Sequence, residues 1–202
     1  MRRRPLDVIG CLALATTLFS ATVFAQAANH FAPAEFQDWP QITDSEKQLR
    51  SPLVQKDAGA EVLVWKAYVV DEFLSLNTLQ RVYYNYVRLK VFDEKGKEQA
   101  ATIDLTSSET SSIIDVAGRT LKADGTFVQL DKNAVHQRDV VRVGSRKRKT
   151  TSFAMPGVEP GAIVEYRWKE VGSGDEIEFV RLQLQRPDGL RGRHHTVVGR
   201  RG

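Results

Sequence analysis

Two Pro-Gly dipeptides, Pro156-Gly157 and Pro160-Gly161, stand immediately before an alternating segment that ends at Trp168. Proline fixes φ near the value required at the second position of a β-turn, and glycine takes the positive φ of the third position of a type II turn. The chain is therefore predicted to reverse over residues 158–161 and to continue as a β-strand.

That strand has two chemically different faces. One face carries four apolar side chains, those of Ala162, Val164, Tyr166 and Trp168. The other face carries three charged side chains, those of Glu165, Arg167 and Lys169. Side chains of a strand alternate between its two sides, so the pattern predicts an amphipathic strand with one buried face. For Glu165 we expect a structural pairing with an arginine, or solvation, and no catalytic role.

Other short alternating segments recur along the chain, separated by turn residues. They cover residues 61–70, 81–92, 99–105, 113–121, 126–130, 135–143, 149–154 and 177–185. Residues 71–80 and 106–112 are expected to be connections. Residues 93–96 are expected to be a tight reversal with Gly96 at positive φ, and residues 122–125 a hairpin turn. The spacing predicts an all-β fold, an antiparallel β-sandwich of roughly eight to ten short strands.

Polar sequence with scattered aromatic residues precedes the first strand. Residues 29–52 predict an extended lead-in whose Phe31, Phe36 and Trp39 dock on the sandwich. A threonine followed three positions later by a glutamate satisfies the exposed amides at a helix start, so residues 43–46 predict a single capped helical turn.

The two ends of the chain differ from its body. Residues 1–27 have the arginine cluster, apolar stretch and small-residue site of a signal peptide, with cleavage predicted near Ala25 or Ala27. A transmembrane anchor is the alternative, but the apolar run is short. The sandwich is assigned to residues 28–186. Residues 187–202 are rich in Arg, Gly and His, and predict either a disordered tail or out-of-frame translation, which the downstream DNA would distinguish.

Export implies a periplasmic or secreted protein without a membrane span once the leader is removed. The formal net charge is only +4, and Arg2, Arg3, Arg4 and Asp7 of the leader account for half of it, so nucleic acid is not an expected partner.

Five segments in order resemble a bacterial exported domain of unknown function that precedes transglutaminase-like domains. They are residues 39–43, 60–63, 86–92, 117–121 with 124–125, and 153–167. The resemblance implies an all-β domain that is not itself catalytic and has no established binding residues. The transglutaminase-like part, with its Cys-His-Asp site, is missing from this sequence. The resemblance therefore implies an amputated fragment or a stand-alone copy of the accessory domain.

Little in the sequence favours catalysis. Cys11 is the only cysteine and lies in the leader, so the mature chain has no thiol nucleophile. The four histidines, His30, His136, His194 and His195, are not framed by a nucleophile motif or a metal-ligand set, and we expect them to be solvent-exposed. We therefore assign no catalytic, cofactor or metal residue.

Two groups of residues are candidates for binding. The densest basic run comprises Arg142, Arg146, Lys147, Arg148 and Lys149; a solvated hairpin tip is the simpler interpretation, and contact with anionic envelope components is the functional one. Tyr84, Tyr86 and Trp168 could form an aromatic shelf for sugars, although core packing explains them equally well.

The sequence thus predicts a non-catalytic exported accessory domain that acts as a scaffold or docks a partner, such as a transglutaminase-like domain. The alternative is a stand-alone binding module for envelope polysaccharide or peptide. The weakest alternative is a hydrolase with two paired carboxylates.

Overall fold

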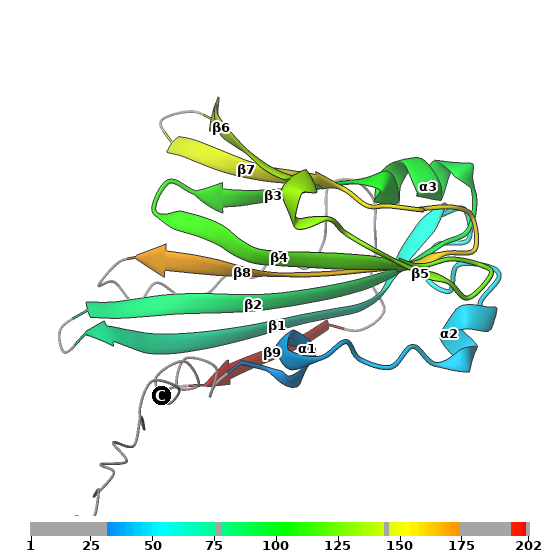
Figure 1. The fold of residues 1–202 in the computed structure, drawn as a ribbon, viewed down its shortest axis with the longest axis horizontal. Helices are drawn as coiled ribbons and strands as arrows, with labels where there is room; N and C mark the ends of the chain where they lie inside the picture. Colours follow the sequence, from blue (N-terminus) through cyan, green and yellow to red (C-terminus); the bar gives the residue numbers. More distant parts are fainter. Residues whose placement is uncertain (1–31, 76–77, 144–145, 174–194, 201–202) are drawn as a thin grey trace, which may run out of the picture. The chain divides into compact units, whose positions relative to one another are not determined.

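The computed structural model describes residues 32–75, 78–143, 146–173 and 195–200. Their strands form two sheets, with order β5-β4-β8-β2-β1-β9 in the larger and β3-β7-β6 in the smaller. Figure 1 shows the smaller sheet stacked on one face of the larger. The strands are β1 (Ala60–Ser75), β2 (Thr78–Val91), β3 (Thr102–Ser108), β4 (Ser111–Leu121), β5 (Phe127–Gln129), β6 (Val135–Val143), β7 (Arg146–Ala154), β8 (Ile163–Ser173) and β9 (His195–Arg200).

An apolar core fills the space between the two sheets. It is built from alternate positions of the facing strands, with Leu89 of β2, Val164 and Tyr166 of β8, Ile103 of β3 and Phe153 of β7 all buried. Alternation places every second side chain of a strand on the same face, so each sheet contributes one apolar face to this core. The predicted all-β sandwich is confirmed.

Strand β8 lies at the centre of the larger sheet, with β2 on one side and β4 on the other. Its entry turn has Gly157 at φ +65 and Gly161 at φ +90, backbone conformations that favour glycine. The charged face of β8, which points away from the core, is not solvated at Glu165, because this side chain has no exposed area. That outer face is covered by the segment that precedes β1.

The covering segment contains two short helices, α1 (Ala34–Gln37) and α2 (Asp44–Gln48). Thr43 and Glu46 form the predicted capping box at the start of α2. The ring of Phe36 meets Tyr84 edge-on at 5.0 Å between centroids, and Trp39 lies 6.4 Å from Tyr86. These two aromatic residues therefore dock on the sheet as expected, while Phe31 lies outside the described residues. Within the described ranges, none of the helices is long and apolar enough to cross a membrane.

The predicted reversal at residues 93–96 is wrong. Residues Glu94–Ala101 form helix α3, and Asp93 caps it by accepting a hydrogen bond from the amide of Gly96 at 2.8 Å. Gly96 is not among the glycines with positive φ. It is needed for close packing, because a Cβ at this position would overlap the carbonyl oxygen of Gly59. Since α3 extends to Ala101, the next strand starts at Thr102.

Two predicted connections are shorter than expected. Strand β1 extends to Ser75, and β2 begins at Thr78. Within this extension, Asp71 and Arg81 are directly paired across the strands and form an ion pair of 2.6 Å. Most of residues 71–80 are therefore strand. Similarly, β3 ends at Ser108 and β4 begins at Ser111, which leaves a two-residue turn.

Part of residues 187–202, for which a disordered or out-of-frame tail is predicted, is described by the structure. Residues His195–Arg200 form β9, which pairs in parallel with residues 65–70 of β1. An edge strand offers unpaired backbone groups, and the β-branched run of residues 196–198 suits a strand there. The predicted leader (1–27) and the predicted strand at 177–185 lie outside the described residues.

The close approach of Gly96 to Gly59 predicts a specific loss of stability. Gly96→Ala should lower the free energy of unfolding by about 3 kcal/mol, because a backbone carbonyl must move to admit the methyl group. Lys95→Ala, at an exposed position of the same helix, should change it by less than about 0.5 kcal/mol. Urea unfolding followed by circular dichroism measures both values, and equal effects would contradict this role of Gly96.

Candidate functional site

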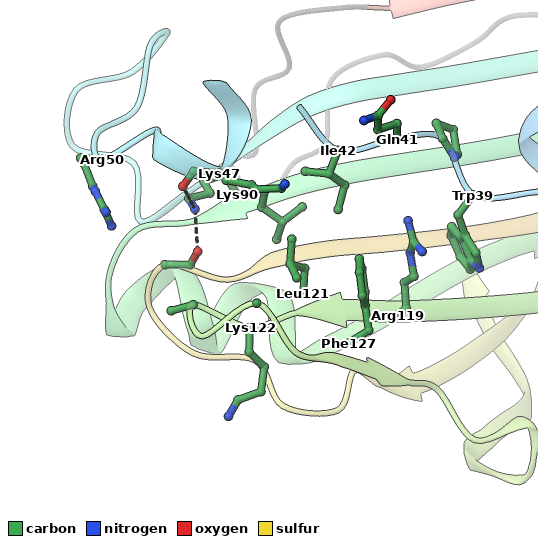
Figure 2. A pocket seen from close by; sticks show the side chains of 15 residues that line it. Trp39, Gln41, Ile42, Lys47, Arg50, Lys90, Arg119, Leu121, Lys122 and Phe127 are labelled. Carbon is green, nitrogen blue, oxygen red and sulfur yellow. Dashed lines mark hydrogen bonds between the residues drawn. The ribbon is translucent and has the colours of Figure 1, made fainter. Parts of the chain in front are cut away.

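The candidate site is a groove on the outer face of the larger sheet, between the N-terminal segment and the β4–β5 hairpin. Its volume is about 460 Å³. Five cationic side chains line it, and none of its fifteen described lining residues is Asp or Glu. The cations are Lys47, Arg50, Lys90, Arg119 and Lys122, and Figure 2 shows them around an apolar middle.

Apolar residues from three parts of the chain form this middle. Ile42 of the N-terminal segment, Leu121 of β4 and Ile163 of β8 make one buried cluster. Leu121 and Ile163 occupy the outer faces of their strands, where strand alternation would otherwise expose them to water, and Ile42 of the N-terminal segment packs against them. The N-terminal segment therefore creates the groove by covering the sheet only in part.

Arg88 of β2 holds this segment in place. Its guanidinium donates to the carbonyl oxygens of Pro40 at 2.8 Å and Gln41 at 3.2 Å. It also pairs with Glu46 of α2 at 2.8 Å, and its side chain is only 4% exposed. Hydrogen bonds from a buried guanidinium are stronger than neutral ones, so one wall of the groove is fixed to the sheet at three points.

Beneath the groove, Glu165 joins two arginines. Its carboxylate accepts from Arg119 Nε at 2.6 Å and pairs with Arg88 Nη2 at 2.8 Å. The hydroxyl of Tyr86 also donates to it, and burial together with the charge of Glu165 raises the pKa of Tyr86. A carboxylate held by these donors has its charge balanced by the arginines, which suits a structural role better than proton transfer.

At one end of the groove, cations and aromatic rings alternate. The guanidinium carbon of Arg119 lies 4.4 Å from the centroid of Phe127 and 4.9 Å from that of Trp39. Arg167 lies 4.4 Å from the same Trp39 ring. Trp39 is therefore held by two cation–π contacts, whereas Phe127 is 46% exposed and available to a ligand.

The basic run predicted from the sequence is not part of the groove. Arg146, Lys147, Arg148 and Lys149 lie in β7 of the smaller sheet, where Arg148 is exposed. His136 is exposed in β6, and nothing is described of the side chains of the other three histidines.

The aromatic shelf hypothesis is wrong. Tyr84 and Tyr86 face the N-terminal segment, whereas Trp168 lies in the core between the sheets and stacks on Tyr166 at 5.7 Å. Trp168 is paired with Asn85 across the strands, so it lies on the face opposite the neighbouring tyrosines. All three rings are buried packing residues.

Sequence reasoning missed Lys90, Arg119 and Phe127 as site residues. They lie in strands β2, β4 and β5, and no local motif connects them. The alternation of Arg88 and Lys90 with apolar residues gave no signal of burial, because charged residues on one face of a strand normally face water.

The sequence model of a family described as a domain of unknown function with a solved structure, DUF3857, matches residues 78–189. No curated protein matches the chain. Among solved structures, a putative protease from Parabacteroides distasonis is 16% identical with a TM-score of 0.45, over 56% of this chain and 23% of that protein. The CBM3a-L domain of the scaffoldin cipA from Clostridium thermocellum is 13% identical with a TM-score of 0.31, over 62% of this chain and 72% of that domain. The chain thus spans about a quarter of the length of the first of these proteins.

The buried position of Glu165 predicts a large effect of removing its charge. Glu165→Gln should lower the free energy of unfolding by about 3 kcal/mol, because Arg88 and Arg119 lose their shared counter-ion. Glu94→Gln, whose partner Lys97 is also exposed, should cost less than about 0.5 kcal/mol. Chemical denaturation of both variants provides the comparison; a small effect at Glu165 would show that the network is not needed for stability.

The contact between Glu46 and Arg88 predicts an acid-sensitive N-terminal segment. Burial raises the pKa of Glu46, but hydrogen bonds from Arg88 and Thr43 outweigh it and leave the pKa lowered. Such a carboxylate stabilises the fold above its ordinary pKa, and the contribution disappears as the pH falls through the lowered value.

Glu46→Gln should therefore cost about 1–2 kcal/mol at pH 7, and this difference from the wild type should vanish in strong acid. Urea unfolding across the pH range, with Trp39 among the fluorescent probes, gives the measurement, and the exposed Glu98→Gln is the control. A cost that stays constant with pH would contradict the assignment.

Proposed function

The chain belongs to the DUF3857 family of domains of unknown function, and we propose that it is a non-catalytic accessory domain that docks a negatively charged envelope component in the groove. The observation that carries this proposal is the lining of the groove, which has five cationic side chains and no acidic one among the described lining residues. Carboxylates outside the lining pair with three of these cations, and Arg50 and Lys90 have no such partner among the described residues. A concave site with one sign of charge raises the local concentration of oppositely charged ligands.

The shape and composition of the groove support binding. Its volume of about 460 Å³ falls in the range of ligand-binding pockets. The exposed ring of Phe127 beside Arg119 provides a rigid contact surface that loses little conformational freedom when a ligand binds. Glu165 is a buried carboxylate bonded to the groove residue Arg119, and its pairing with two arginines favours binding over acid–base chemistry.

The cellular setting remains part of the proposal. The signal-like residues 1–27 favour export, with cleavage near Ala25 or Ala27, and a periplasmic or secreted location for the sandwich that follows, which we assign to residues 28–186. The resemblance noted above favours a place beside a transglutaminase-like domain, for which this domain would serve as scaffold and docking element.

A second candidate is a stand-alone module that binds envelope polysaccharide or peptide through the basic run. It is favoured by the exposure of Arg148 in strand β7 of the smaller sheet. The two candidates use different sheets, so substitutions can separate them.

Retention of the purified chain on insoluble bacterial cell-wall material tests the proposal. Phe127→Ala combined with Lys122→Ala should reduce retention about tenfold, because a planar contact and a positive charge at the groove are lost. Lys147→Ala combined with Arg148→Ala should leave retention unchanged. The reverse result would support the second candidate, and wild-type protein that is not retained would contradict both.

A further inference from the structure

Lys90 is a buried cation at the groove whose hydrogen-bond donors are not all used. The residue is 2% exposed, and its ammonium donates to the carbonyl oxygens of Gly161 at 2.5 Å and Lys47 at 3.1 Å. An ammonium group has three N–H donors, so two are used within the described part of the chain and one is left there for a further acceptor. Figure 2 shows Lys90 beside Lys47 at the end of the groove nearer to Arg50.

Carboxylates partner three of the other four groove cations. Arg119 pairs with Glu165 at 2.6 Å, and Lys47 with Asp44 at 3.0 Å. Lys122 lies 3.6 Å from Glu159. Among the residues that the structure describes, Lys90 and Arg50 are the groove cations without an ion-pair partner. The unneutralised charge therefore lies at one end of the groove.

These two positive charges also affect each other. Burial is the main cause that lowers the pKa of Lys90, and the charge of Arg50 lowers it further. Two neighbouring cations, one of them removed from water, oppose folding unless another interaction compensates. The carbonyl oxygens of Gly161 and Lys47 orient the ammonium of Lys90 but do not neutralise its charge.

We propose that Lys90 and Arg50 form a binding site for an oxyanion, the carboxylate or phosphate group of the ligand that occupies the groove. The inference rests on the proposed function and specifies where the negative charge of the ligand is bound. The rest of the ligand lies over the apolar middle at Leu121 and reaches Phe127 at the far end.

The geometry suits this chemistry. The ammonium of Lys90 is fixed by carbonyls from two separate segments, residue 47 in α2 and residue 161 before β8, so little freedom is lost when an anion binds. Arg50 is exposed at the mouth and offers a planar fork of donors that matches carboxylate or phosphate oxygens. Together they provide one fixed and one adaptable donor group.

Isothermal titration of the full chain with sodium phosphate, and separately with sodium glutarate, at constant ionic strength tests the site. Arg50→Gln should weaken binding of the accepted probe about tenfold, and Lys90→Met should abolish it. The matched control is Arg138→Gln, an exposed arginine in β6 of the smaller sheet, which should change the affinity less than about twofold.

The two probes distinguish the chemical sources, since binding of phosphate alone indicates a phosphoryl ligand and binding of glutarate alone a carboxylate. If neither probe binds the wild type, or if Arg50→Gln binds as tightly as Arg138→Gln, the inference is overturned. Arg50→Gln keeps the test valid even if Lys90→Met does not fold, because Arg50 lies at the surface. Retention on cell-wall material without probe binding overturns only this inference, whereas probe binding without retention overturns only the proposed function.

Discussion

The outer half of the structure depends on the buried ion pairs of Glu165 with Arg88 and Arg119. Charged groups on a sheet normally face water, and here they are covered, so each must be matched by an opposite charge or a hydrogen bond. With Glu165 in place, Arg88 can remain buried and direct its other donors to Pro40, Gln41 and Glu46. Through Arg88, this one carboxylate helps to fix the N-terminal segment and with it one wall of the groove.

The larger sheet thus has two interfaces of different chemistry. Its inner face meets the smaller sheet through apolar side chains such as Leu89 and Tyr166. Its outer face meets the N-terminal segment largely through charge, as where Glu35 binds Lys66 at 2.5 Å and accepts from Tyr68 at 3.0 Å. Apolar burial is non-directional, whereas charged hydrogen bonds fix geometry. The first interface is therefore held by non-directional apolar burial, and the second positions the site.

Local sequence patterns predicted the parts of the fold that depend on local chemistry. The turn at Gly161, the alternation of β8 and the capping box of Thr43 with Glu46 each need only neighbouring residues. The prediction of a turn at Gly96 was wrong because a glycine required for a turn and a glycine required for close packing cannot be distinguished in the sequence. The distinction needs the position of Gly59, which lies against Gly96 in the fold. The groove could not be predicted for the same reason, since Lys90 and Phe127 come to line one groove only through the sheet order and the covering segment.

The covering segment also has a consequence for the order of folding. Arg88 and the Glu165 that neutralises it are 77 positions apart, and Arg167 reaches back 132 positions to the carbonyl of Glu35. Contacts of such long range form late, because closing a long loop is entropically costly. Residues 32–50, although synthesised early, can be immobilised only when β8 has taken its place. The groove therefore does not exist in partly folded chains, and occupancy by a ligand would report that the whole domain has reached its native state.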